Sequence, residues 1–374
     1  MKANHGNNTH ILHIASGDLW AGAEVMLFTL AKALNELPDI QVSSVILNHG
    51  KLEQKLRDSG IPVIVLDESR LNSLQILRQL KVIIRDMNPD VVHTHRNKEN
   101  FLGGLAARLN NVPSLRTVHG APEHRPPLHQ LPKHLIRFLD WFSGRFFQQH
   151  IVAVSPDLAH TLEQSFSAEK IRTIENGIDI DSITKNLLPG ENQSGFKIGI
   201  AGRLVTVKRV DLFIQTAHYL KQHNPELSIQ FHIYGDGPLH DALQTQLRSL
   251  QAENYIHLEG NCENIAKELT TLDALLMPSD HEGLPMILLE AMCLKTAIIA
   301  HAVGGIPQLL DKGRCGTLVY QQTPEAFANA ITELFAEPER FQKLSQQAFE
   351  HVQQKYSVQH TATAYLKVYN EITN

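Results

Sequence analysis

The chain has 374 residues, a formal net charge of -5 at pH 7 and a hydrophobic fraction of 43%. This length predicts two domains or three, and the acidic balance argues against binding nucleic acid through bulk charge. No run of eighteen apolar residues occurs, the N-terminal MKANHGNNTH lacks the apolar core of a signal peptide, and the three cysteines are scattered. We therefore expect a cytoplasmic protein without a membrane span or a disulfide framework.

Short apolar runs alternate with helical patterns through the first half of the chain. Strands are predicted at 11–16, 42–47, 62–66, 90–95, 114–119 and 151–155, and helices at 23–34, 74–87, 99–109 and 132–148. This alternation is typical of βαβ units that form a parallel sheet covered on both faces.

A Gly- and Pro-containing stretch, LLPGENQSG (187–195), then interrupts the pattern and is interpreted as a linker. Beyond it the alternation restarts, with strands predicted at 196–202, 229–235, 255–260, 274–279 and 297–301 and helices at 210–220, 239–250, 284–294 and from 323 onward. The fold class is therefore α/β, with two tandem Rossmann-like, doubly wound parallel-sheet domains. Ligands of such sheets bind beyond the carboxyl ends of the strands, so we expect a site in the cleft between the domains.

The first strand-to-helix turn, SGDLWAGAE (16–24), carries Gly17 and Gly22 beside a predicted helix start. Helix N-termini offer free N–H groups to phosphate, and glycine permits close approach of the backbone. The turn matches neither the dinucleotide GxGxxG pattern nor a Walker motif. A phosphate site and an ordinary Gly-rich turn both remain open.

Histidines end two predicted strands of the first half. His119 lies in TVHG (117–120), and His93 and His95 end the preceding strand. A metal site is conceivable for the last two, but no third ligand is evident, so lining of the cleft is the favoured interpretation.

Two turns of the second half follow strands in the same way. GRLVTVKR (202–209) places Arg203, Lys208 and Arg209 at a strand end, where they can bind an anion or form a solvated basic turn. GDGPL (235–239) contains Gly235 and Gly237, which can accept a positive φ in a nucleotide pocket or in a simple tight turn.

The stretch EGLPMILLE (282–290) brackets seven uncharged residues with Glu282 and Glu290. An unpaired buried carboxylate costs several kcal/mol or becomes protonated. A hydroxyl-rich ligand would supply hydrogen-bond donors to both, whereas the alternative is a structural glutamate bonded to nearby backbone.

Taken together, these segments resemble glycosyltransferase family 4, of GT-B fold. The resemblance is carried by GAE (22–24), TVHG, ENGID (175–179), GRLVTVKR, GDGPL and the E-x7-E pattern followed by Ala-Met. It covers essentially the whole chain, and EGLP with LLEAM is its most specific part. It implies an acceptor-binding domain at 1–190, a nucleotide-sugar-binding domain at 191–356 and a final helix at 357–374 that crosses back to the first domain.

The resemblance also implies an activity. Members transfer a sugar from a nucleotide diphosphate donor to an acceptor hydroxyl with retention of anomeric configuration and without a metal ion, so no cofactor is expected. Arg203 and Lys208 would neutralise the diphosphate, Glu290 would hold the ribose hydroxyls and Glu282 the donor sugar. UDP is favoured over GDP or ADP, and the expected acceptor is a sugar or a lipid-linked sugar of a cell-surface polysaccharide, lipopolysaccharide or glycolipid.

Further donor contacts follow from the same resemblance. His119 would touch the donor sugar from the first domain, and Gly22 would let the first loop approach the phosphates. The donor site would also include Gly235, Gly237, Gly283 and Leu284.

The chain departs from the family pattern at two positions. Ala21-Gly22 replaces the Gly-Gly that many members have before Ala-Glu, and the extra methyl group changes how this loop meets the donor. Gln308 stands where Glu often follows GGIP, a change expected to have little catalytic effect.

The segment 125–147 is not a general family signature. It mixes basic residues with one Trp and four Phe: Arg125, Lys133, Arg137, Arg145, Trp141, Phe138, Phe142, Phe146 and Phe147. Such a segment suits peripheral docking on an anionic membrane, at the inner face of which a lipid-linked acceptor would lie. The alternative is a helix packed on the core with a solvated basic face.

Two other functional classes remain open. One is a different reaction on the same scaffold, such as sugar-nucleotide epimerisation or phosphorolysis, although no lysine site for pyridoxal phosphate is evident. The other is a sugar-nucleotide sensor, which loss of Glu282, His119 or Lys208 would favour, yet all three are present.

Overall fold

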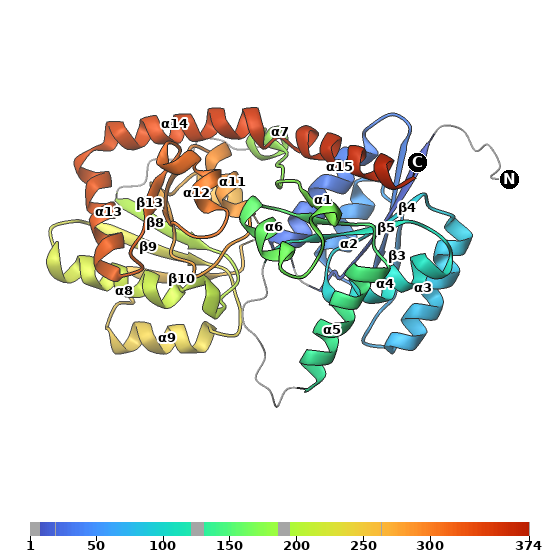
Figure 1. Ribbon diagram of the computed structural model, residues 1–374. Coiled ribbons are helices and arrows are strands. Elements are labelled where there is room, and N and C mark those ends of the chain that lie inside the picture. The colour runs from blue at the N-terminus through green and yellow to red at the C-terminus, as the bar shows by residue number, and fades with distance from the viewer. Residues whose placement is uncertain (1–7, 19, 121–130, 186–194, 263, 374) are drawn as a thin grey trace. The chain divides into compact units, whose positions relative to one another are not determined.

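The computed structural model describes residues 8–18, 20–120, 131–185, 195–262 and 264–373 (Figure 1). The chain divides into two units, residues 1–177 with 358–374 and residues 178–357. The second unit begins before the expected 190/191 boundary because Ile178 already pairs with its end: the N–H of Ile178 donates to the carbonyl of Tyr356 at 2.8 Å. Most of the predicted linker lies outside the described residues.

The first unit is built on one seven-stranded sheet. Its strands are β1 (Thr9–Ala15), β2 (Ile40–Ile46), β3 (Val63–Val65), β4 (Val91–Thr94), β5 (Ser114–Val118), β6 (His150–Ala153) and β7 (Ile171–Thr173). They lie in the order β3-β2-β1-β4-β5-β6-β7, and each neighbouring pair is parallel. Its helices are α1 (Gly22–Asn35), α2 (Lys51–Asp58), α3 (Ser73–Met87), α4 (Asn97–Leu109), α5 (Leu131–Phe146), α6 (Pro156–Glu163), the 3-10 turn η1 (Ala168–Lys170) and α15 (Val358–Thr373).

Alternation along β1 and β4 gives the two faces of this sheet different chemistry. Leu12, Ile14 and Val92 belong to an apolar cluster with residues of α3 and α4. Their neighbours His13 and His93 point to the other face, because successive strand side chains alternate. There α15 packs against α1 and β4. The final helix is therefore part of the first unit.

The second unit repeats the plan with six strands, all parallel. These are β8 (Phe196–Ala201), β9 (Ile229–Tyr234), β10 (Ile256–Gly260), β11 (Ala274–Met277), β12 (Ala297–His301) and β13 (Thr317–Val319), in the order β10-β9-β8-β11-β12-β13. The helices are α7 (Ile180–Thr184), α8 (Val210–His223), α9 (His240–Ser249), α10 (Ile265–Leu269), α11 (Met286–Cys293), α12 (Ile306–Leu309), α13 (Pro324–Ala336) and α14 (Pro338–Lys355), with the 3-10 turns η2 (Thr206–Lys208) and η3 (Asp311–Gly313).

The core of the second unit is apolar on the face that α8 and α13 cover. Phe213 of α8 meets Phe231 of β9 edge to face at 5.7 Å, and Ile331 of α13 is fully buried in the same cluster. A sheet buried on both faces positions its strand ends rigidly, so the turns beyond those ends can hold side chains in fixed places. Among the described residues, no helix combines the length and the apolar character that crossing a membrane requires.

Candidate active site

The turns after β8 and β9 pack directly on each other in the second unit. Gly235 has a φ of 130°, and a Cβ there would overlap the carbonyl oxygen of Gly202, so only glycine fits. Gly237 does not adopt a positive φ. Instead, a Cβ on Gly237 would lie 2.6 Å from the carbonyl oxygen of Leu204, whose own N–H donates to Asp236 at 3.0 Å. The two glycines thus hold the GRLVTVKR and GDGPL turns together.

The three basic residues of the first of these turns have different surroundings. Arg209 is occupied structurally, because it bonds Asp211 and Asp280, each at 3.1 Å. The hydrogen bond that Arg209 donates to Asp211 raises the pKa of Arg209. Arg203 is exposed and has no ion-pair partner within the described part of the chain. Among the described residues, Arg203 thus has no competing carboxylate, whereas Arg209 is held by two and Lys208 by one, Glu282.

Lys208 and Glu282 are joined, although 74 positions separate them in the sequence. Lys208 Nζ donates to Glu282 Oε1 at 2.7 Å, with Lys208 half-buried and Glu282 buried. The backbone supports this contact, because the N–H of Asp280 donates to the carbonyl of Val207 at 2.8 Å. A cation and a carboxylate thus lie side by side beyond the carboxyl ends of β8 and β11.

The loop after β12 holds Glu282 from the other side. Gly304 has a φ of 56°, and a Cβ there would overlap the carbonyl oxygen of Glu282. The N–H of Gly305 donates to the carbonyl oxygens of Glu282 at 3.3 Å and Gly283 at 3.1 Å. Leu284 is buried in the unit.

Glu290 lies on α11 and has one carboxylate oxygen without a partner. Its Oε2 is buried and accepts no hydrogen bond from the described residues. Burial raises the pKa of Glu290 to about 7. An unsatisfied buried acceptor costs free energy that a donor from a bound molecule would recover. It belongs to the second of the two glutamates that bracket the EGLPMILLE stretch.

In the first unit, Gly22 begins α1 as the sequence indicates. The preceding N–H of Ala21 donates to Glu24 at 3.1 Å. Glu24 also pairs with Arg96 at the start of α4, and Arg96 lies 3.7 Å from Asp18. The charges around this turn are therefore bonded to one another.

Four histidines of the first unit, at positions 13, 93, 95 and 119, lie together in one cluster. His13 Nδ1 and His95 Nε2 are 3.1 Å apart, and His95 Nδ1 and His119 Nε2 are 3.4 Å apart. His93 lies between Tyr369 and Thr117, with 2.8 Å to each hydroxyl. Burial lowers the pKa of His13 to about 3, and burial with the charge of Arg96 lowers that of His119 to about 4. The rings are therefore uncharged at neutral pH.

This cluster also answers the question of a metal site. The third ligand that the sequence did not show is present, because ring nitrogens of His13, His93 and His95 all lie within 4.8 Å of one another. Both nitrogens of His93 are nevertheless bonded to hydroxyl groups, and the facing nitrogens of His13 and His95 bond each other. Among the described residues, His13 Nε2 is the nitrogen of these three rings that is buried without a hydrogen-bond partner.

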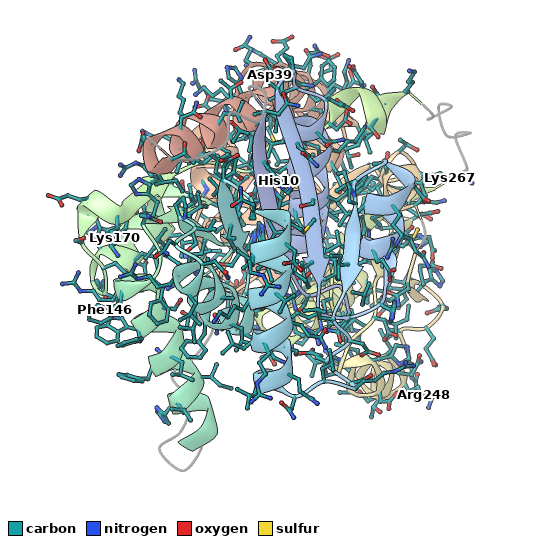
Figure 2. All side chains as sticks on the ribbon, turned by 90° about the vertical axis from the view of Figure 1, so that its right-hand side faces the viewer. His10, Asp39, Phe146, Lys170, Arg248 and Lys267 are labelled. Atoms are coloured by element: carbon teal, nitrogen blue, oxygen red, sulfur yellow. The ribbon has the colours of Figure 1, made fainter. Side chains whose placement is uncertain are left out.

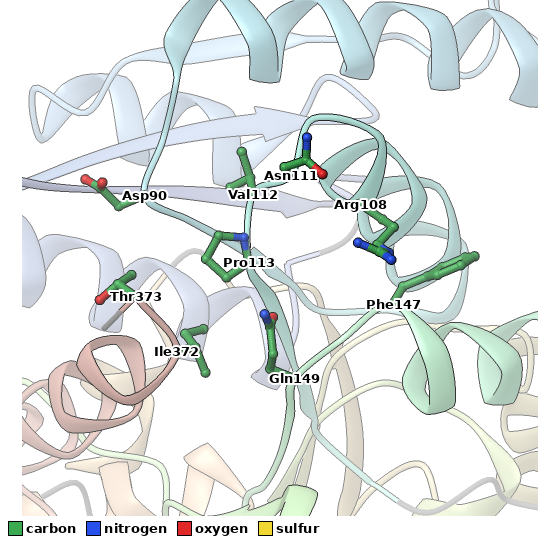
Figure 3. Close-up of a pocket in the computed structure, with 9 residues that line it drawn as sticks. All are labelled: Asp90, Arg108, Asn111, Val112, Pro113, Phe147, Gln149, Ile372 and Thr373. Carbon is green, nitrogen blue, oxygen red and sulfur yellow. The ribbon is translucent and has the colours of Figure 1, made fainter. Parts of the chain in front are cut away.

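A separate pocket of about 230 Å³ opens at the opposite edge of the first sheet (Figure 3). Asp90, Pro113 and Gln149 come just before or at the beginning of β4, β5 and β6, and Thr373 lies at the end of α15. Asp90 and Gln149 accept backbone N–H bonds from His10 and Ser114, at 2.9 and 2.8 Å. Asp90 and Gln149 thus stabilise the fold through these bonds. The pocket lies at the amino ends of the strands, whereas the predicted site lies beyond their carboxyl ends.

The protein has two parallel-sheet units, and a lysine–glutamate pair lies beyond the strand ends of the second. This arrangement is typical of GT-B glycosyltransferases that use nucleotide sugars. A Glycosyltransferase Family 4 model matches residues 20–182, and a Glycosyl transferases group 1 model matches residues 195–337. Together they span most of both units. The chain belongs to glycosyltransferase family 4 and is an enzyme of the hexosyltransferase type.

Relatives agree with this assignment along most of their length. The chain is 26% identical to the Escherichia coli UDP-Gal:alpha-D-GlcNAc-diphosphoundecaprenol alpha-1,3-galactosyltransferase over 350 residues, which is 89% of each chain. It is 21% identical to a D-inositol 3-phosphate glycosyltransferase of Paenarthrobacter aurescens, covering 98% of this chain and 93% of the relative.

Solved structures show the same fold. A glycosyltransferase from Rickettsia africae superposes with a TM-score of 0.81 at 22% identity, over 98% of this chain and 99% of the other. The Anabaena protein HepE, solved with UDP-glucose, superposes with a TM-score of 0.82 at 20% identity, over 97% and 100% of the two chains. The predicted fold class is confirmed.

Proposed function

We propose that this enzyme transfers a sugar from a UDP-sugar to a hydroxyl group of a cell-surface polysaccharide, lipopolysaccharide or glycolipid precursor, with retention of anomeric configuration. The pair formed by Lys208 and Glu282 is the observation that carries this proposal. It brings a cation suited to the diphosphate next to a carboxylate suited to sugar hydroxyls. The UDP complexes of HepE and the UDP-galactose named for the Escherichia coli relative support the choice of nucleotide.

The proposed step breaks the bond between the anomeric carbon and the diphosphate oxygen. The acceptor oxygen forms the new bond on the same face, and its proton passes to the departing phosphate. Negative charge develops on that phosphate, and Arg203 and Lys208 would stabilise it without a metal cofactor. Removing one such preorganised group typically raises a barrier by about 3–4 kcal/mol.

Within this proposal the two carboxylates act on different hydroxyls. Glu282 would hold the transferred sugar, and the unsatisfied Oε2 of Glu290 would accept from the ribose. His119 would contact the sugar, and the glycines at 22, 235 and 237 would let backbone approach the phosphates. A Glu282 variant should mainly slow turnover, whereas a Glu290 variant should mainly weaken donor binding.

For the acceptor, we propose a lipid-linked sugar at an anionic membrane surface, where α5 docks. This helix packs on the unit through polar contacts, the reverse of an ordinary surface helix. Its inner face is polar, because Asp140 accepts from Arg116 at 2.7 Å and from Asn100 at 2.9 Å, and Ser143 donates to the carbonyl of Asn100 at 2.6 Å. A helix that uses its polar side for packing leaves its apolar side to the surroundings.

The outer face of α5 carries large apolar side chains that are 38% to 57% exposed: Leu135, Ile136, Phe138, Trp141 and Phe146. Figure 2 shows Phe146 at the outer surface of the unit, near Lys170. Arg145 lies over the Phe146 ring at 5.8 Å, and the one acidic residue of the helix, Asp140, faces inward. Aromatic residues with basic neighbours match an anionic bilayer interface, and the Escherichia coli relative is named for a diphosphoundecaprenol acceptor.

A binding screen tests the proposed donor. The protein is heated with UDP-, GDP- and ADP-sugars, and a UDP-sugar present at 100 times its Kd should stabilise the folded state by about 2.7 kcal/mol. Glu290→Ala should lose this shift, whereas Glu325→Ala, on the exposed first turn of α13, should keep it. Stabilisation by GDP- or ADP-sugars alone contradicts the proposed nucleotide, and an equal shift in both variants contradicts the assigned site.

A further inference from the structure

The histidine cluster contains a directed chain that leads to His119. His13 lies inside β1, His95 follows β4, and His119 follows β5. The ring planes of His13 and His95 differ by 26° with centroids 5.3 Å apart, and those of His95 and His119 differ by 24° with centroids 5.6 Å apart. The two hydrogen bonds of 3.1 and 3.4 Å connect the three rings in series.

Each neutral imidazole in such a chain holds one proton and must donate with one nitrogen and accept with the other. One end of the chain sets the direction. His13 Nε2 is buried and has no partner among the described residues. A buried N–H without an acceptor is rarer than a buried acceptor without a donor. The proton of His13 therefore resides on Nδ1 and is donated to His95 Nε2.

The proton position of His13 then fixes those of His95 and His119. Because His95 accepts at Nε2, its own proton resides on Nδ1 and is donated to His119 Nε2. His119 accepts at Nε2 and so carries its proton on Nδ1, the nitrogen that no described residue occupies. We propose that His13 and His95 are positioning residues that fix the tautomer of His119, so that His119 offers an N–H donor at Nδ1 to an oxygen of the sugar nucleotide.

Neighbouring residues pack around these three histidines without taking part in the hydrogen bonds between them. His93 packs against both His13 and His95, with ring centroids at 4.9 and 4.2 Å. Its nitrogens are closed off by Tyr369 of α15 and by Thr117, whose hydroxyl also meets Tyr365 at 2.8 Å. Arg96 is the charged group that acts on His119, and its positive charge opposes a second proton there.

The tautomer of His119 does not depend on the proposed function. Only the use of its Nδ1–H as a donor to the sugar nucleotide rests on that function. A free neutral histidine prefers its proton on Nε2. The hydrogen-bonded series of three histidines therefore predicts the less common tautomer of His119, with the proton on Nδ1. In protein labelled with ¹⁵N-histidine, two-bond ¹H–¹⁵N correlation should show His119 with a protonated Nδ1 and an unprotonated Nε2. A wild-type His119 protonated on Nε2 overturns the proposal, even if every variant fails to fold.

Three variants separate this role from general packing. His95→Leu removes the donor and should return His119 to the Nε2–H form. His95→Asn restores an amide N–H near the Nδ1 position and should restore the Nδ1–H form. His10→Leu, on the same strand as His13 but bonded to Ser43, should change nothing. An unchanged His119 spectrum in folded His95→Leu overturns the proposal.

Activity supplies a second readout. If the proposed transfer occurs, kcat/KM should fall about tenfold in His95→Leu, as expected for the loss of one hydrogen bond, and should recover in His95→Asn. Equal losses in both variants would assign His95 a packing role only. If no transfer is observed at all, the proposed function fails while the spectra still decide the tautomer.

Discussion

Glu290 shows how a residue can be positioned for a ligand at the expense of the fold. Its carboxyl is on a helix whose other side chains are mostly buried and apolar, and its raised pKa comes from burial alone. Most polar groups in such a place have a partner. The unsatisfied Oε2 is therefore the atom at which stability and binding should respond in opposite directions.

We predict that Glu290→Gln stabilises the protein in the absence of donor, increasingly so as the pH rises. The folded chain binds the proton of Glu290 more tightly than the unfolded chain does, so the wild type loses stability as the pH rises from about 4.5 to about 7. A pKa raised from 4.5 to about 7 corresponds to about 3–4 kcal/mol at most. Denaturant unfolding at pH 5 and pH 8 measures this difference, and a gain that is equal at both pH values would contradict it.

Gly304 is the residue that fixes the backbone of Glu282. We predict that Gly304→Ala destabilises the protein by about 1–3 kcal/mol more than Gly313→Ala, because both residues have a positive φ but only Gly304 lacks space for a Cβ. Thermal unfolding of both variants measures the difference. The Gly304 variant should also lose sugar transfer, and equal stability of the two variants would show that the loop after β12 does not support Glu282.

At the scale of elements, α5 is a helix that exposes several large apolar side chains. We predict that Phe138→Ser combined with Phe146→Ser reduces binding to vesicles that contain anionic lipid at least tenfold, because two exposed aromatic anchors are lost. Vesicle sedimentation with and without anionic lipid measures the effect, and Leu109→Ser, an exposed apolar residue of α4, is the matched control. Undiminished binding by the double variant would leave α5 without a membrane role.

The sequence predicted the long elements of both units but missed several short ones, for physical reasons. The strand predicted at 114–119 is β5, and the helix predicted at 74–87 is α3, because long apolar periodicities identify elements reliably. By contrast, α2 has only two buried residues in eight, Leu52 and Leu56, and β13 is three residues long. Such elements depend on tertiary packing rather than on local pattern.

The candidate site was predictable to a similar degree. Lys208 and Glu282 were singled out because their motifs follow predicted strands, although their direct contact was not predicted. His13 was missed because it lies inside a strand, where no local signal tells a core histidine from a functional one. Gly304 was missed because its role is to make room for a backbone atom 22 positions away, but the Gly-Gly pair directly after β12 was a usable signal.

At the scale of the whole molecule, each unit has its own parallel sheet and its own core, and the two family models match one unit each. The residues assigned to the proposed reaction belong to different units, His119 to the first and Lys208, Glu282 and Glu290 to the second. Substitutions in either unit should therefore impair transfer, but only those in the second should abolish binding of the nucleotide.

Transfer of a labelled sugar tests the central claim most directly. The wild-type enzyme is incubated with a panel of UDP-sugars labelled in the sugar and with lipid-linked diphosphate sugar acceptors, and the label in the lipid product is counted. We predict transfer by the wild type and by Glu325→Ala, and a loss of about 100-fold or more in folded Glu282→Ala and Lys208→Ala. Wild-type rates in both of these variants would contradict the assignment of the site on which the account depends.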